Sequence, residues 1–82
     1  FSMAPRLARA LVRLIDPARE DGRLRFDPNQ SDLGAFAGLA RENVSRLLSD
    51  WEGQGVIARV GRTLTVRDRS YLQALADFGD EG

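Results

Sequence analysis

The sequence has 82 residues, of which 43% are hydrophobic and 29% charged, so it describes one small globular domain rather than a disordered or repetitive chain. It contains neither cysteine nor histidine, which argues against a disulfide framework, thiolate metal sites and imidazole-based catalysis. No apolar run approaches the roughly 20 residues of a membrane span, and no signal peptide is evident near the start. These observations favour a cytoplasmic domain that is not an enzyme and carries no cofactor or metal of its own.

The 12 arginines and 12 acidic residues give a formal net charge of zero, but they are segregated along the chain. Six arginines and three acidic residues lie in segment 1–26, and two arginines and five acidic residues lie in segment 27–54. Segment 55–67 has three arginines and no acidic residue, and segment 68–82 has one arginine and four acidic residues. Overall neutrality argues against a generic polyanion binder, because non-specific nucleic-acid affinity depends on excess positive charge. All the cations are arginine, whose planar fork suits two-point binding of phosphates, carboxylates and guanine edges.

The first part of the chain predicts one helix and a connector. Residues 1–3 look like the remnant of a cleaved expression tag. Residues 4–15 have apolar side chains at three- and four-residue spacing, which indicates an amphipathic helix that ends before Asp16-Pro17. Residues 17–28 predict a connector that contains one short β-stub. The face of the helix that we expect to be solvated carries Arg6, Arg9 and Arg13.

Two helices joined by a glycine-containing turn follow. Residues 29–32, Asn-Gln-Ser-Asp, are rich in side chains that cap a helix start, and Gly38 is a natural stop for the short helix after them. The next helix is predicted over residues 41–54. Gly34 is small where the two helices must approach closely, and Gly38 permits a left-handed turn. The inward positions between the two helices are apolar: Leu33, Ala37, Leu39, Val44 and Leu47.

The remaining chain predicts a β-hairpin and a last helix. The β-rich runs 56–60 and 63–66 are joined by Gly61-Arg62, which fits a type II′ turn with a basic tip. Asp68 is the expected cap of the last helix, and residues 79–82 form an acidic tail.

This element order predicts a mainly α fold with a small β-hairpin wing, that is, a winged helix-turn-helix domain over residues 4–78. A core of this size needs large apolar side chains. Those expected to complete it are Phe26, Phe36, Trp51, Tyr71, Leu72 and Phe78.

The exposed face of the predicted helix 41–54 is the candidate functional surface, because the second helix of a helix-turn-helix enters the major groove of DNA. Arginine can bind guanine through two hydrogen bonds, glutamate can accept from the cytosine amino group, and serine can serve either. The residues predicted to read bases are Arg41, Glu42, Ser45 and Arg46. The alternative is that Glu42 and Arg46, four residues apart, are only a surface ion pair. Such a pair could also orient Arg46 before DNA arrives.

Residues 30–48, QSDLGAFAGLARENVSRLL, and residues 51–57, WEGQGVI, closely resemble the C-terminal DNA-binding domain of the Crp/Fnr family of bacterial transcription regulators. The shared features are an Asp-Leu pair, a glycine turn, an R-E-x-V-S-R core and a glycine-hydrophobic-isoleucine entry to the wing. The resemblance covers roughly residues 5–78. It assigns base contacts to Glu42, Ser45 and Arg46, with Arg41 as a further contact in some members, and its E-x-x-S-R form is similar to those that read TTGA-like half-sites.

The same resemblance implies a homodimeric regulator of double-stranded DNA. It implies two-fold symmetric operators, an N-terminal sensor domain outside this chain whose effector is unknown, and RNA polymerase as a partner of the full-length regulator. The rival interpretation is a winged helix that docks a protein and does not bind DNA, with the neutral net charge as its main support.

The sequence departs from the family pattern at Ala40, where a serine or threonine usually caps the recognition helix and touches a phosphate. The loss of this cap shifts the expected phosphate contacts to other side chains. These are Gln30, Ser31, Asn43 and Arg62. The alternative is that Gln30, Ser31 and Asn43 are ordinary helix-capping or surface residues. Arg62 would then only increase solubility at the hairpin turn.

Overall fold

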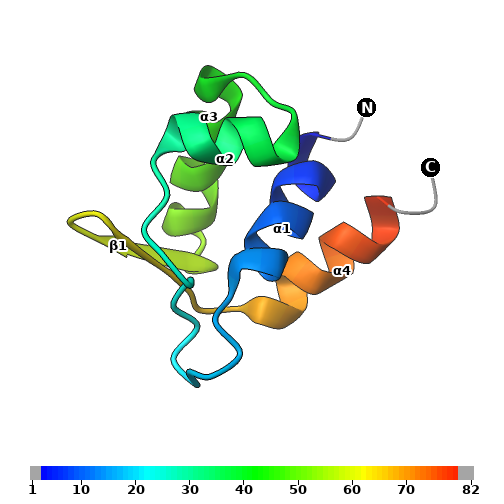
Figure 1. The fold of residues 1–82 in the computed structure, drawn as a ribbon. Coiled ribbons are helices and arrows are strands. Elements are labelled where there is room, and N and C mark those ends of the chain that lie inside the picture. Colours follow the sequence, from blue (N-terminus) through cyan, green and yellow to red (C-terminus); the bar gives the residue numbers. More distant parts are fainter. Residues whose placement is uncertain (1–2, 80–82) are drawn as a thin grey trace.

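The computed structural model describes residues 3–79, which form four helices and one antiparallel hairpin (Figure 1). The elements are α1 (Met3–Leu14), α2 (Gln30–Ala37), α3 (Arg41–Gly53), β1 (Ile57–Val60), β2 (Thr63–Val66) and α4 (Arg69–Gly79). This is a winged helix-turn-helix, so the predicted fold class is confirmed. The expected tag remnant and acidic tail lie mostly outside the described residues, although Met3 begins α1 and Gly79 ends α4.

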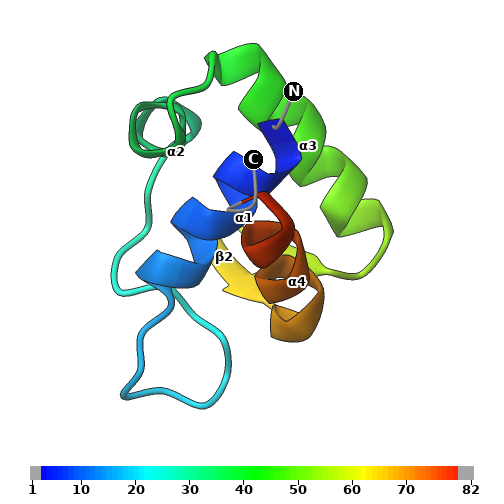
Figure 2. The same cartoon turned by 90° about the vertical axis from the view of Figure 1, so that its right-hand side faces the viewer.

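Helix α1 is the central element of the core. Leu7, Ala8 and Leu11 are completely buried, and α1 contacts α2, α3 and α4 (Figure 2). Its small Ala8 and the buried Ala76 of α4 leave room for the close packing of these two helices. None of the helices in the described part of the chain is long and apolar enough to cross a membrane.

The prediction that six large side chains complete the core is wrong for four of them. Trp51 and Leu72 are buried, as expected. On α4 the buried face is formed by Leu72 and Ala76, and helical geometry places Tyr71 and Phe78 about a quarter-turn or more away from it. Apolar spacing alone therefore selected the wrong side of that helix. The exposed aromatic residues are Phe26, Phe36, Tyr71 and Phe78.

The helix-turn-helix forms as its sequence predicts. Asn29 caps α2 through a reciprocal box, in which its Oδ1 accepts from the Asp32 N–H at 2.7 Å and the Asp32 carboxylate accepts from the Asn29 N–H. Gly38 ends the helix in the left-handed region with φ of 71°. At Gly34 an added Cβ would lie 2.6 Å from the carbonyl oxygen of Leu39, so the predicted close approach is real and involves the connecting turn.

The connector attaches to both α1 and the wing. The predicted β-stub is present as isolated bridges, Leu24 to Ile15 and Arg23 to Thr65, rather than as a continuous strand. The carbonyl of Gly22 accepts a 2.9 Å hydrogen bond from the Val66 N–H. Elsewhere in this loop, Arg19 donates two hydrogen bonds to the carboxylate of Asp21 and lowers the pKa of Asp21 to about 2.

The wing has the predicted strands and turn. Strands β1 and β2 pair antiparallel with Val60 opposite Thr63, which leaves Gly61 and Arg62 as a two-residue loop. Gly61 has φ of 62° and Arg62 a negative φ, as a type II′ turn requires. The predicted cap of α4 also forms, because Asp68 Oδ1 accepts from the Tyr71 N–H at 3.1 Å.

The contact at Gly34 leads to a stability prediction. We expect Gly34→Ala to lower the free energy of unfolding by about 1–3 kcal/mol, because the new methyl group would overlap the backbone of Leu39. The control is Gly53→Ala near the end of α3, where nothing lies within 4 Å of an added Cβ, so that change should be neutral or stabilising by up to about 1 kcal/mol. Urea unfolding followed by circular dichroism measures both. Equal stability of the two variants would contradict the close approach.

Candidate nucleic-acid interface

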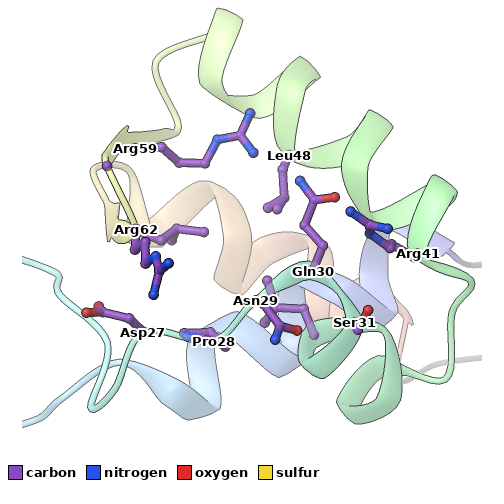
Figure 3. A pocket seen from close by; sticks show the side chains of 12 residues that line it. Asp27, Pro28, Asn29, Gln30, Ser31, Arg41, Leu48, Arg59 and Arg62 are labelled. Carbon is purple, nitrogen blue, oxygen red and sulfur yellow. The ribbon is translucent and has the colours of Figure 1, made fainter.

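A groove of about 710 Å³ opens between the start of α2, the exposed side of α3 and the wing (Figure 3). Four of the residues that the sequence predicts to contact DNA line this groove: Gln30, Ser31, Arg41 and Arg62. The capping box at Asn29 fixes the first turn of α2, and the hairpin turn places Arg62 on the opposite side of the groove. Ser31 and Arg62, which are 31 positions apart in the sequence, therefore line the same groove.

A second, shallower hollow of about 410 Å³ runs along α3 and continues the first, because both include Gln30 and Arg41. It is lined by Gln30, Arg41, Glu42, Ser45, Arg46 and Ser49. All four predicted base-reading residues therefore lie on one surface. We call the two hollows together the α3–wing surface. Ser49 was missed in the sequence, although its position four residues after Ser45 places it on the same helix face.

Asn43 lies outside both hollows and has a different contact. Its Oδ1 accepts a hydrogen bond from Arg46 Nη2 at 2.8 Å, one helical turn further on. The ion pair between Glu42 and Arg46, which was the alternative to base reading, is not present among the described residues. Asn43 is half-buried whereas Glu42 is exposed, and the less mobile amide is the partner that holds the guanidinium.

The start of α3 has no side-chain cap. Ala40 occupies the N-cap position with φ −68° and ψ 148°, and no side chain bonds to the first turn, as the sequence predicts. The N–H groups of Asn43 and Val44 bond to the Ala40 carbonyl, and those of Arg41 and Glu42 precede the first intrahelical bond. The first turn of α3 thus keeps donors for an anion but lacks the hydroxyl that usually accompanies them.

An ion pair that the sequence did not indicate joins the wing to α3. Arg59 on β1 donates to Glu52 Oε1 from Nη2 at 2.8 Å and from Nε at 3.2 Å. The two residues are seven positions apart on different elements, so no helical spacing rule connects them. The contact holds the wing against α3 and neutralises one of the arginines that line the larger groove.

The α3–wing surface is basic although the chain as a whole is neutral. The larger groove is lined by three arginines and one carboxylate, which belongs to Asp27, and because Glu52 pairs with Arg59 the groove keeps an excess of one positive charge. The segregated charge of the sequence therefore becomes a local excess of positive charge where the wing faces α2 and α3.

Comparison with known proteins agrees with this geometry. The family model described as the Crp-like helix-turn-helix domain matches residues 5–75. The chain belongs to this family. It is accordingly a DNA-binding domain of a transcription regulator of the Crp/Fnr type. No curated protein sequence is similar enough to count as a match.

Solved structures of Crp/Fnr regulators superpose on most of the chain. The catabolite activator protein of Thermus thermophilus is 32% identical over 95% of this chain, with a TM-score of 0.79. FixK2 of Bradyrhizobium japonicum is 30% identical over 89%, with a TM-score of 0.76. A transcriptional regulator of the CRP/FNR family, also from Thermus thermophilus, is 26% identical over 92%, with a TM-score of 0.77. The matches cover only 35%, 37% and 40% of these relatives, respectively.

The wing contact can be tested through Glu52. We expect Glu52→Gln to lower the free energy of unfolding by only about 0.2–1 kcal/mol, because both partners are partly exposed to solvent. The wing amides should nevertheless exchange faster with solvent, since the contact between Arg59 of β1 and α3 loses its ionic part. Hydrogen exchange measured by NMR reports this directly. Asp50→Asn, on an exposed α3 residue without an ion pair among those described, is the control, and equal exchange in both variants would exclude a role for the contact.

Proposed function

We propose that this domain binds DNA sequence-specifically, with α3 in the major groove. Arg41, Glu42, Ser45 and Arg46 would meet base edges from the exposed side of that helix. The start of α2 and the tip of the wing lie on opposite sides of the larger groove beside α3, where they could reach the phosphate backbone that borders the bound helix. The proposed phosphate contacts are Gln30, Ser31 and Arg62.

The observation that carries this proposal is the convergence of the predicted residues. Seven of the eight residues chosen from the sequence line one continuous, basic surface, although they come from α2, α3 and the wing. The exposed face of α3, with arginine, glutamate and serine side by side, matches the mixture of donors and acceptors in a major groove. The absence of a cap at Ala40 places more of the phosphate binding on Gln30, Ser31 and Arg62.

For the eighth residue, Asn43, we propose positioning in place of the predicted phosphate contact. Its hydrogen bond restricts the Arg46 guanidinium before DNA binds, which reduces the rotamer entropy lost on complex formation. Arginine reads guanine through a planar two-point contact, so its orientation affects specificity as well as affinity.

The longer relatives support a proposal for the complete regulator. A full-length chain would be a homodimer whose two copies of α3 lie about 34 Å apart, one turn of B-DNA, on a two-fold symmetric operator. A sensor domain would hold the effector, and RNA polymerase would be a partner of that assembly. An isolated domain should bind more weakly, because it lacks the gain in effective concentration from the second site.

Direct base reading can be tested by fluorescence anisotropy with a duplex carrying an inverted TTGA repeat and a scrambled duplex of the same composition. We expect tighter binding to the repeat, and a loss of about 5- to 150-fold for Glu42→Ala or Arg46→Ala on the repeat only, equivalent to about 1–3 kcal/mol. Arg62→Ala should weaken binding to both duplexes and reduce the salt slope by about 1. Arg69→Ala, on α4, is the control and should change neither.

The other outcomes of this titration are informative. Equal, salt-sensitive binding to both duplexes would retain DNA as the ligand but reject this half-site. Binding that is absent even at low salt would overturn the proposal in favour of a protein-docking winged helix.

A double-mutant cycle tests the role of Asn43. If Asn43 acts through Arg46, Asn43→Ala should weaken binding to the repeat and reduce the preference over the scrambled duplex, but should have no further effect in an Arg46→Ala background. A direct phosphate contact predicts the opposite, namely equal losses in both backgrounds and on both duplexes, together with a smaller salt slope. Asn43→Gln, whose longer amide cannot keep the same geometry, should resemble the alanine variant.

A further inference from the structure

A groove of about 340 Å³ lies between α1 and the end of α2, apart from the α3–wing surface. It is lined by Arg6, Arg9, Ala10, Arg13, Leu14, Phe36 and Ala37, and it shares no residue with the two hollows described above. In Figure 1 the end of α2 meets α1 on the side of the molecule away from the hairpin. We call this the α1–α2 groove.

The α1–α2 groove has a one-sided charge. Three arginines line it and no carboxylate does. Helix α1 contains no acidic residue between Met3 and Leu14, so Arg6 and Arg13 have no opposite charge on their own helix. Arg6 and Arg13 are exposed, at i and i+7 on one helix face, about 10.5 Å apart along the axis.

The floor of the groove is apolar and partly aromatic. Phe36 is 56% exposed, and Phe26 beside it is 46% exposed, with ring centroids 6.1 Å apart in an edge-to-face arrangement. Both rings therefore keep about half of their surface in water, where covering it would be favourable. Their mutual contact fixes both rings without covering them.

We propose that the α1–α2 groove binds an acidic protein segment that carries an apolar anchor. Carboxylates of the segment pair with Arg6 and Arg13, and an apolar side chain packs on Phe36 between them. Spacing of about 10.5 Å matches carboxylates two helical turns apart on one face of a helix. Because this site and the α3–wing surface share no residue, the domain can hold a protein partner and DNA at the same time, and the inference stands independently of the DNA-binding proposal.

The apolar floor distinguishes this ligand from a nucleic-acid backbone. Phosphates would use the arginines but would leave Phe36 and Leu14 uncovered. A purely apolar partner would leave the charges of Arg6 and Arg13 without a counterpart. An acidic segment with an apolar side chain satisfies both parts of the groove.

The test uses a fluorescein-labelled helical peptide in which glutamates two turns apart flank a leucine and a phenylalanine. We expect binding that causes NMR shifts of amides around Arg13 and Phe36. The double variant Arg6→Glu/Arg13→Glu should weaken binding at least about tenfold and should instead bind the same peptide with lysines in place of the glutamates. Phe36→Ala should weaken binding of both peptides to their respective proteins, since the apolar anchor is common to them.

The control is Arg67→Glu/Arg69→Glu, which makes the same change of charge on exposed residues away from this groove. It should bind the glutamate peptide like the unmodified domain. Failure of the peptide to bind, shifts confined to α3, or equal losses in both charge-reversed proteins would overturn the proposal. A DNA affinity that falls with Arg6→Glu/Arg13→Glu, without peptide binding, would assign the groove to the DNA backbone instead.

Discussion

The complete burial of one face of α1 is the constraint on which the other elements depend. Leu7, Ala8 and Leu11 leave no solvent-accessible surface on that face, and α2, α3 and α4 all pack against this helix. A domain of 82 residues has only one core, so each of these helices must turn its apolar side towards α1. The outer side of α3 is left exposed as a result, and the same packing also leaves Arg6 and Arg13 of α1 exposed.

Local chemistry explains which features could be predicted from the sequence. The glycines at 34 and 38 and the turn at Gly61-Arg62 were identified because each requires a backbone geometry that few other residues tolerate. The candidate site followed from helical spacing on α3 and from the family motif. Contacts between elements distant in the sequence have no local pattern from which to predict them. Arg59 reaches Glu52, for example, only because the hairpin folds back against α3.

The misplaced aromatic residues show a second limit of the sequence. Phe36 and Phe78 have the spacing of core residues, but α2 buries Leu33 and Gly34 and α4 buries Leu72 and Ala76, so both rings lie on other faces of their helices. The sequence also does not decide whether Arg46 bonds to Asn43 or to Glu42, because both residues lie within about one helical turn of it. Relative burial of the two partners decides such cases, and burial is a property of the fold.

The connector has a consequence for the behaviour of the hairpin at high concentration. One side of β2 pairs with β1, and the other is occupied by Gly22 and Arg23 at Thr65 and Val66, so this end of β2 offers no free edge to a strand from another molecule. Gly22 has φ of 82°, and an added Cβ would overlap the Val66 carbonyl, so only glycine closes that edge. This short loop thus shields the end of β2 from strand addition by another molecule, whereas the outer edge of β1 has no such cover among the described residues.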